Sequence, residues 1–320
     1  MQTHRNGSAL LTVLWLTAAL SAIGLAVATN VRGETERTST SVDDTKSWFV
    51  ARGAIEQASL HILWRDYRDS SGLPLYYRPG QPVINLDFPA AQVSVRIVPE
   101  TAKLSPNTIK PVELLRLLSA LGVPEERAND IASAIVDWRT PVRPDEPSAF
   151  DAFYLSQSPS FLPRHASFLE NEELLLTKGM TPGIYYGESL DDSRAGLRDC
   201  LSVYGSNGAV DINSAEPATL AAIGLSLDDA RAIVQRRAAQ PFDTYMALGE
   251  LQKELGPLGS RLSLGGRTMF TLRATARLKQ QDGKLSDLRR TVAALVQFTF
   301  PGNIKSKAPG YRVIRWYDRP

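Results

Sequence analysis

The sequence is poor in residues that build cofactor and catalytic sites, because its 320 residues include one cysteine and three histidines. A single thiol, Cys200, can form neither an intramolecular disulfide nor a zinc site of the multi-cysteine type. The histidines, His4, His61 and His165, lack the spacing of metal ligands. There is no glycine-rich phosphate loop and no nucleophile with a nearby base. We therefore expect no enzymatic activity, no catalytic residue and no cofactor.

An excess of one charge is also lacking, because 36 Lys and Arg nearly balance 34 Asp and Glu. A net charge of +2 gives little general attraction to nucleic acid. Charge is absent altogether from residues 6–31, an apolar run between Arg5 and Arg32. Because about 20 apolar residues in a helix cross a bilayer core, this run predicts one membrane span, at residues 8–30. The basic leader places its N-terminal side in the cytoplasm.

The apolar run admits three interpretations. Ala26-Val27-Ala28 offers the small-x-small pattern at which a secretory signal peptide is cut, and an uncut run would serve as a plain anchor. The third interpretation rests on Gly7-Ser8, where a glycine directly precedes the apolar helix. This arrangement resembles the leader of type IV pilins and type II secretion pseudopilins. In those proteins a prepilin peptidase cuts after the glycine, and the apolar helix is kept.

The downstream sequence favours the third interpretation. Residues 31–68 contain no proline, and apolar side chains from Trp48 to Trp64 recur at helical intervals. A membrane helix that continues as an amphipathic helix to residue 68 suits a pilin stem, whereas a cleaved signal peptide does not need it. The resemblance therefore implies a leader at residues 1–7 and processing between Gly7 and Ser8.

One position departs from the usual pilin pattern. Most pilin-like proteins carry Glu as the fifth residue of the mature chain, where its carboxylate can pair with the N-terminal amine of a neighbouring subunit. Counted from Ser8, that position is Thr12. A neutral residue gives up this charge pair inside the membrane. Among pseudopilins, the one that usually lacks the Glu is minor pseudopilin K.

Strand patterns flank a helical region. The alternation of half-buried strands is found once before residue 101 and three times after residue 262. These predicted strands are 91–98, 268–278, 291–299 and 311–317. We predict an α+β fold, in which a pilin-like long N-terminal helix packs on an antiparallel sheet and a large inserted all-α domain contains helix-hairpin-helix-like repeats. The predicted segments are the leader 1–7, the transmembrane helix 8–30, the pilin-like parts 31–100 and 263–320, and the inserted domain 101–262.

Two segments of the helical region are alike, residues 104–139 and 210–237. Each opens a short apolar helix with proline and closes it with glycine, before an acidic turn and a second helix. The pattern resembles helix-hairpin-helix motifs, whose loop amides approach phosphate in nucleic-acid-binding members. Here the loops are Gly122-Val123-Pro124 and Gly224-Leu225-Ser226, followed by acidic residues that repel phosphate. We therefore expect structural or protein contacts, and no nucleic-acid partner.

In the second repeat we expect apolar side chains to maintain the fold and three arginines to occupy a solvated helix face. The apolar residues are Leu220, Ile223, Leu225, Ile233 and Val234, and the arginines are Arg231, Arg236 and Arg237.

Further pieces of the sequence follow one another in the order of a known family. They lie at residues 134–138, 151–156, 168–174, 178–182 and 210–215. Together with the leader and Thr12, they resemble minor pseudopilin K of the type II (general) secretion system. The resemblance implies a structural subunit at the tip of a periplasmic pseudopilus, for export of folded proteins across the outer membrane.

The resemblance also implies partners and a location. The expected partners are other minor pseudopilins, the prepilin peptidase, the inner-membrane secretion platform and the lipid bilayer. The expected location is the bacterial inner membrane, crossed once, with the bulk of the chain in the periplasm. The alternative is a membrane-tethered periplasmic DNA-binding protein that uses the helix-hairpin-helix motifs.

Members of the family can bind calcium in the helical domain through carboxylates and carbonyls. Thr140 and Phe150 stand where the family tends to have acids, whereas Asp145, Glu146 and Asp151 remain in the same loop. A solvated acidic loop is the favoured interpretation of these three residues. We therefore assign no metal site and keep calcium as an alternative.

Overall fold

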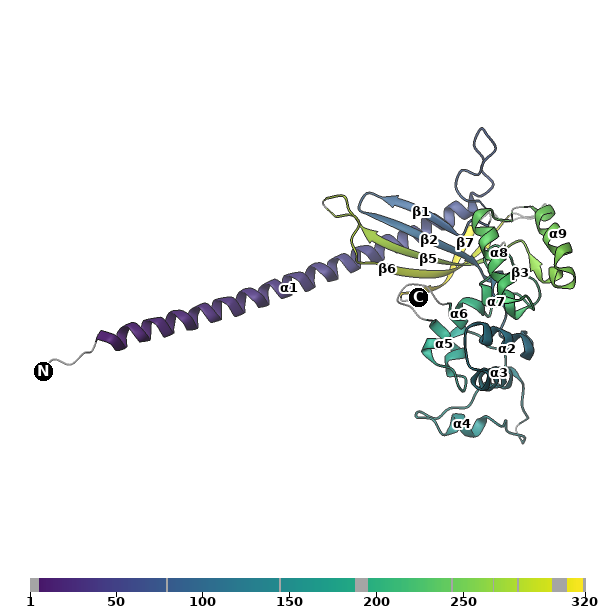
Figure 1. Cartoon of the computed structure of the whole chain (residues 1–320), viewed down its shortest axis with the longest axis horizontal. Coiled ribbons are helices and arrows are strands. Elements are labelled where there is room, and N and C mark those ends of the chain that lie inside the picture. The colour runs from purple at the N-terminus through teal and green to yellow at the C-terminus, as the bar shows by residue number, and fades with distance from the viewer. Residues whose placement is uncertain are drawn as a thin grey trace.

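In the computed structural model, one long helix projects from a body made of a five-stranded sheet and many short helices (Figure 1). The structure describes all residues except 1–5, 79, 144, 188–194, 243, 267, 281, 301–309 and 319–320. The long helix, α1 (Asn6–Leu63), confirms the predicted continuous helix, although it ends before residue 68.

The C-terminal part of α1 packs across one face of the sheet through small side chains. Ala51, Ala54 and Ala58 are fully buried beside Ile55 and Ile62. Alanines at helical spacing let the helix approach the strands closely, and each buried isoleucine contributes about 1.5–3 kcal/mol. The strand residues of this first hydrophobic core include Val93, Val95, Ile97, Leu272, Ala274, Ala276, Val292, Ala294 and Val296.

The sheet is antiparallel throughout, with strand order β1-β2-β5-β6-β7. Its strands are β1 (Val83–Phe88), β2 (Ala91–Pro99), β5 (Met269–Leu278), β6 (Arg290–Thr299) and β7 (Gly310–Tyr317). Neighbours β2 and β5 pair directly, although the whole helical region lies between them in the sequence. The helical region is therefore an insertion that leaves and re-enters the sheet at adjacent strands.

The prediction of a single strand before the helical region was wrong, because β1 precedes β2. This strand buries Ile84 and Leu86 in the alternating manner of a half-buried strand. It is short, and Pro82 and Pro89 bound it on either side. Proline is tolerated next to edge strands and weakens the sequence signal of a strand.

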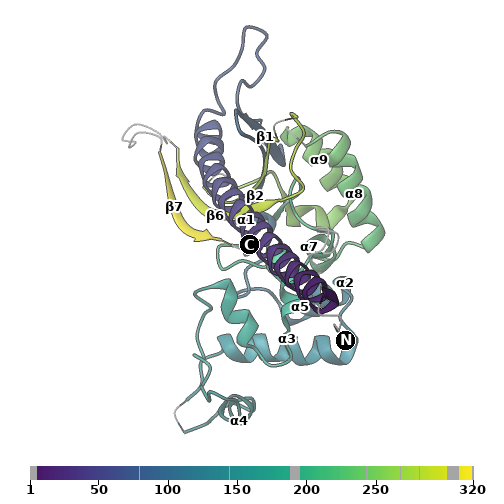
Figure 2. The same ribbon diagram turned by 90° about the vertical axis from the view of Figure 1, so that its left-hand side faces the viewer.

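The inserted region packs around a second hydrophobic core of its own. Its elements are η1 (Glu100–Ala102), α2 (Pro111–Ala120), α3 (Glu125–Arg139), α4 (Asp151–Leu155), η2 (Asn171–Leu176), α5 (Pro182–Tyr186), α6 (Leu197–Cys200), β3 (Val210–Asp211), α7 (Pro217–Ala222), α8 (Leu227–Ala239), α9 (Tyr245–Glu254), η3 (Gly256–Arg261) and β4 (Leu262–Ser263). The all-α description is incomplete, because β3 and β4 form a short parallel pair. Figure 1 shows this region at the end of the body away from the N-terminus, and Figure 2 shows α8 and α9 on one side of α1, with β6 and β7 on the other. The domain boundaries given above stay predictions.

Both repeats begin and end as their sequences indicate. Pro111 and Pro217 occupy the first position of α2 and α7, where a missing N–H costs nothing. Gly122 and Gly224 follow these helices with φ of 80° and 119°, a region that favours glycine. Helices α2 and α7 pack against each other, so the two helix pairs form one unit.

Candidate functional site

The first half of α1 is a candidate membrane anchor. Its side chains stand free of the body, as Leu10, Leu14 and Trp15 show with exposures of 73%, 65% and 69%. In the described part of the chain, this helix is long and apolar enough to cross a membrane, judged by length and composition. A helix that is apolar on all sides and unburied fits a single membrane anchor for an otherwise soluble body.

The predicted processing residues, Gly7 and Ser8, lie in the first turn of α1. The leader residues 1–5 fall outside the described residues. Cleavage between Gly7 and Ser8 therefore stays a prediction. Thr12 lies one turn further along the same helix.

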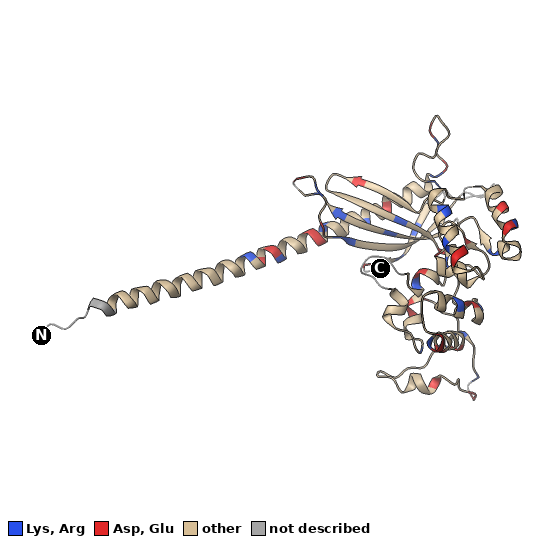
Figure 3. Cartoon of the chain, in the orientation of Figure 1, with Lys and Arg blue, Asp and Glu red and all other residues tan. Residues whose placement is uncertain are grey.

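The sheet face opposite α1 contacts the inserted region through arginines. Arginines on β2, β5 and β7 each meet carboxylates of the inserted region, and Figure 3 shows basic positions along these strands. The pairs are Arg96 with Glu216 (2.8 Å), Arg273 with Asp199 (3.6 Å), and Arg315 with Glu170 and with Glu172 (3.6 Å to Glu172). Three strands of the sheet are thus tied to the insertion by opposite charges.

Two of these arginines face each other in the sheet, and carboxylates of the insertion offset their charges. Arg96 and Arg273 stand directly opposite each other on β2 and β5. Like charges at facing positions destabilise a sheet, by an amount comparable with the roughly 0.2–1 kcal/mol that a favourable pair contributes. Glu216 and Asp199 supply the missing negative charges from the inserted region. The insertion therefore supplies the negative charges that offset the two facing arginines of the sheet.

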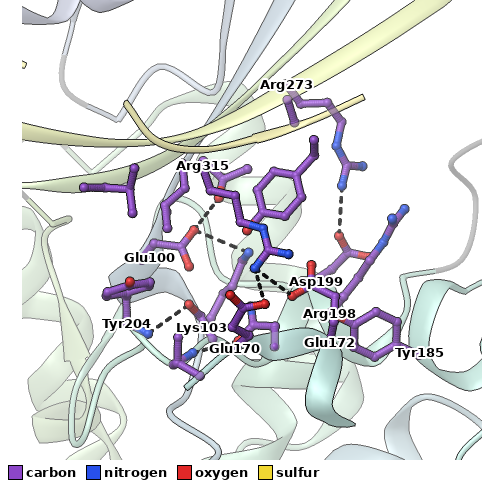
Figure 4. Close-up of a pocket in the computed structure, with 18 of the residues that line it drawn as sticks. Glu100, Lys103, Glu170, Glu172, Tyr185, Arg198, Asp199, Tyr204, Arg273 and Arg315 are labelled. Carbon is purple, nitrogen blue, oxygen red and sulfur yellow. Dashed lines mark hydrogen bonds and ion pairs between the residues drawn. The ribbon is translucent and has the colours of Figure 1, made fainter. Parts of the chain in front are cut away.

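A cavity of about 220 Å³ separates this sheet face from the inserted region (Figure 4). On one wall, Thr271 Oγ1 donates to Glu100 Oε1 at 2.6 Å, and Lys103 Nζ lies 3.4 Å from the same oxygen. Glu100 is only 2% exposed. A carboxylate buried to this degree needs such partners to offset its lost hydration. The cavity is thus part of a polar seam between the two hydrophobic cores.

Tyrosines also line this seam. Burial raises the pKa of Tyr185 and of Tyr317, the latter to about 12, and the negative charge of Glu172 adds to both shifts. Both phenols therefore stay protonated near neutral pH and act as neutral hydrogen-bonding groups. General acid–base catalysis at neutral pH would need phenol pKa values shifted in the opposite direction.

The two repeats share a hydrogen-bond pattern that the sequence analysis did not identify. Asn107 Nδ2 donates to the Phe168 carbonyl at 3.0 Å, and the Phe168 N–H donates to Asn107 Oδ1 at 2.7 Å. Asn213 makes the same two bonds with Phe242, at 2.7 and 2.9 Å. The two asparagines occupy equivalent positions in the repeats. Each one therefore fixes a distant loop to the start of its own helix pair.

A second shared pattern joins an arginine to two carbonyls. In each repeat, an arginine near the end of the second helix donates to backbone carbonyls that precede the first helix. The contacts are Arg139 to Pro106 and Ile109, both at 2.6 Å, and Arg237 to Ile212 and Ala215, both at 2.7 Å. With matching arginines and asparagines, the repeats are two versions of one structural unit. The sequence signal of this unit is the asparagine and the arginine that the two repeats share at matching positions.

The prediction that Arg237 lies on a solvated face was therefore wrong. Its guanidinium is turned into the protein, and burial lowers its pKa from the ordinary value. Arg231 does lie on such a face, because its side chain is 64% exposed and pairs only loosely with Asp228. Arg236 packs over the Phe242 ring, 5.1 Å from its centre. The three arginines thus have three different roles.

The apolar residues of the second repeat belong to the inserted core. Four are buried, with exposures of 0–6%, and the fifth packs against the cluster while partly exposed. The buried residues are Leu220, Ile223, Leu225 and Ile233, and the partly exposed one is Val234. Their burial supports the expectation that these residues maintain the fold, which stays a prediction.

The middle side chain of each hairpin loop is buried in the protein. Val123 and Leu225, the middle residues of the loops, are 8% and 6% exposed. A Cβ added to Gly224 would lie 2.9 Å from Leu258 Cδ2, so the second loop packs tightly against η3. Phosphate binding by such a loop needs accessible amides. The packing supports a structural use of the repeats, and their identity as helix-hairpin-helix motifs stays a prediction.

The acids considered for calcium do not converge. Asp151 accepts from the Ser148 N–H at 3.0 Å, and its other oxygen lies 2.9 Å from His165 Nε2. Asp145 and Glu146 are exposed. Among the described residues, no group of three or more His, Cys, Asp or Glu could hold a metal ion. These acids therefore do not fit a calcium ion, and calcium binding stays an alternative without a site.

A protein family and a solved structure are similar to this chain. The family described as type II secretion system, protein K, matches residues 95–187, from β2 through α5. A chain of the GspK–GspI–GspJ crystal structure from the enterotoxigenic Escherichia coli type 2 secretion system is 15% identical, with a TM-score of 0.52. The similarity covers 88% of this chain and 98% of that chain. No curated protein sequence matches.

The structural likeness concerns the fold, including the long helix, the antiparallel sheet and the additional helices. The family match falls on the junction of the sheet and the insertion and on the first repeat, the parts that an ordinary pilin-like sheet does not need. Residues 95–187 thus match the type II secretion system protein K family, the minor pseudopilin K family that the sequence resembles, and the fold of the chain is similar to that of a chain in the GspK–GspI–GspJ complex.

Proposed function

We propose that this protein is the minor pseudopilin at the tip of the type II secretion pseudopilus, a structural component for the export of folded proteins across the outer membrane. One observation supports this most strongly. The anchor helix runs without a break into a pilin-like sheet, and a bulky insertion is tied to the free face of that sheet. Such a molecule links a membrane to a body held at a fixed distance from it.

The insertion supports a terminal position in the filament. It occupies the end of the body opposite the membrane helix (Figure 1). A subunit stacked above it along the filament would collide with this lobe. Thr12 supports the same position, because a topmost subunit has no neighbouring N-terminus above it to pair with a glutamate.

The partners and the location follow from this position. The Escherichia coli complex contains GspK together with GspI and GspJ. By analogy, we propose two other minor pseudopilins as partners of this chain. We place the anchor in the bacterial inner membrane and the body in the periplasm, with the prepilin peptidase and the inner-membrane secretion platform as further contacts. The role is structural and not catalytic.

The test combines reconstitution with electron microscopy. The body of this protein, mixed with those of the other two minor pseudopilins, should elute as one complex of fixed stoichiometry. In assembled filaments, a label on this protein should mark one end only. The Thr12→Glu variant should behave in the same way, because the insertion still blocks stacking. Long filaments built from this protein alone would contradict the proposal.

A further inference from the structure

The chain connects the inserted region to the sheet at one place. The chain leaves the sheet after Pro99 at the end of β2 and returns at the start of β5, where Pro99 faces Phe270. A Cβ added to Gly266 would lie 2.6 Å from Thr101 Oγ1, so the outgoing and returning segments pack against each other. The two crossings therefore form one narrow joint at the paired ends of β2 and β5.

Away from this joint, charged and apolar side chains surround a cavity between the sheet and the inserted region. The two bodies have separate hydrophobic cores, and the cavity lies between them. Ion pairs from Arg96, Arg273 and Arg315 bridge the seam. Interfaces between domains that are small and polar permit relative motion, whereas large apolar ones prevent it.

One group of ion pairs across the seam lies away from the joint and is partly exposed to solvent. β7 is two strands away from β5 in the sheet, so Arg315 holds the open side of the seam. The side chains of Arg315, Glu170 and Glu172 are 38%, 53% and 36% exposed. Solvent and salt screen charge pairs that are exposed to this degree. A contact of this kind can close and open as conditions change.

We propose that the inserted region is a hinged lobe that swings away from the sheet about the β2–β5 joint, with Arg315, Glu170 and Glu172 as its latch. Opening the latch widens the cavity and exposes its tyrosine-lined wall. The lobe closes again when the charges meet. This device does not depend on the role in secretion, so it can be tested on the purified protein.

The experiment measures the distance between the two bodies in the full chain in detergent. Spin labels are attached to cysteines introduced at Gln92 on β2 and Ser133 on α3, both of which are exposed. The native Cys200 is fully buried and should not react. Pulsed electron resonance then gives the distance distribution at low salt and at 1 M salt, with unlabelled native protein as the check on Cys200.

The latch variant is Arg315→Glu, and Arg312→Glu is its matched control. Arg312 lies on the same strand and, among the described residues, donates to Gln297 within the sheet. At low salt, Arg315→Glu should raise the population with longer distances about fivefold, the change expected from losing exposed ion pairs. High salt should do the same to the native protein. Arg312→Glu should have no effect.

A charge swap distinguishes a latch from general damage. Combining Arg315→Glu with Glu170→Lys and Glu172→Lys should restore the native distance distribution at low salt. A distribution that neither Arg315→Glu nor 1 M salt changes would overturn the hinge. Equal opening by Arg312→Glu would overturn the latch. If Arg315→Glu unfolds the lobe, the salt series on the native protein and the charge-swapped variant still show whether the lobe opens when these ion pairs are weakened.

Discussion

Arg237 offers the sharpest test of the internal packing. Its Nη1 donates to the carbonyls of Ile212 and Ala215 at 2.7 Å, which joins the end of α8 to the segment before α7. Replacing it by alanine removes both bonds and leaves two inward-facing carbonyls without this partner. Arg231, on the same helix but 64% exposed, is the matched control.

The expected loss follows from the bonds. Hydrogen bonds to a charged group contribute about 1.5–3 kcal/mol each. Arg237 is half-buried, so water can replace part of the interaction, and we take the lower end for both bonds, about 3 kcal/mol in total. Replacing Arg231 should cost no more than about 0.5 kcal/mol. Domains are stable by about 5–15 kcal/mol, so the first change is large and the second small.

Native-state hydrogen exchange with mass spectrometry resolves the lobe from the sheet. In Arg237→Ala, amides of α7 and α8 should exchange about a hundredfold faster, as 3 kcal/mol of lost stability requires. Amides of β5 and β6 should keep their rates, because they belong to the other core. If the exchange rates of the α7 and α8 amides in Arg237→Ala lie within threefold of those in Arg231→Ala, the structural role of Arg237 is refuted.

Further outcomes are expected in the inserted region. Asn213→Ala should destabilise the lobe by about 1–3 kcal/mol in urea unfolding, since both of its bonds to the Phe242 backbone are lost; an unchanged midpoint would contradict the repeat unit. Burial raises the pKa of Asp211 above 3.8, so stability from this group is full below about pH 4 and falls as pH rises through the raised value. Asp211→Asn should therefore flatten the stability profile above about pH 4, and an unaltered profile would contradict this prediction. Calcium or a chelator should change the melting temperature by less than about 2 °C, whereas a larger rise with calcium would show that the chain binds this ion.

Local patterns in the sequence were sufficient for the main elements. The proline-free run predicted α1, and the alternation in β2, β5, β6 and β7 predicted four of the five strands. Pro217 and Gly224 marked the limits of α7, because the first helical turn tolerates proline and the residue after a helix favours glycine. These signals depend on neighbours in the sequence.

Contacts between distant residues were not predictable in this way. Thr271 bonds Glu100, 171 residues away, and Arg96 bonds Glu216, 120 residues away. Nothing local distinguishes such residues from solvated ones, as the mistaken prediction for Arg237 shows. The polar seam thus became visible only once the fold had brought β2, β5 and β7 against the insertion. The same holds for the open acidic loop, whose side chains could have converged on an ion but do not.

The central claim is that this chain keeps its apolar helix as the stem of a pilin-like subunit. The most direct measurement is the mature N-terminus, determined by mass spectrometry on protein purified from membranes. We expect a chain that begins at Ser8 with a methylated amine and retains the whole of the apolar helix. A bulky residue in place of Gly7 should leave the leader attached. A mature chain that begins at Thr29 would mark residues 1–28 as a cleaved signal peptide and would contradict the account.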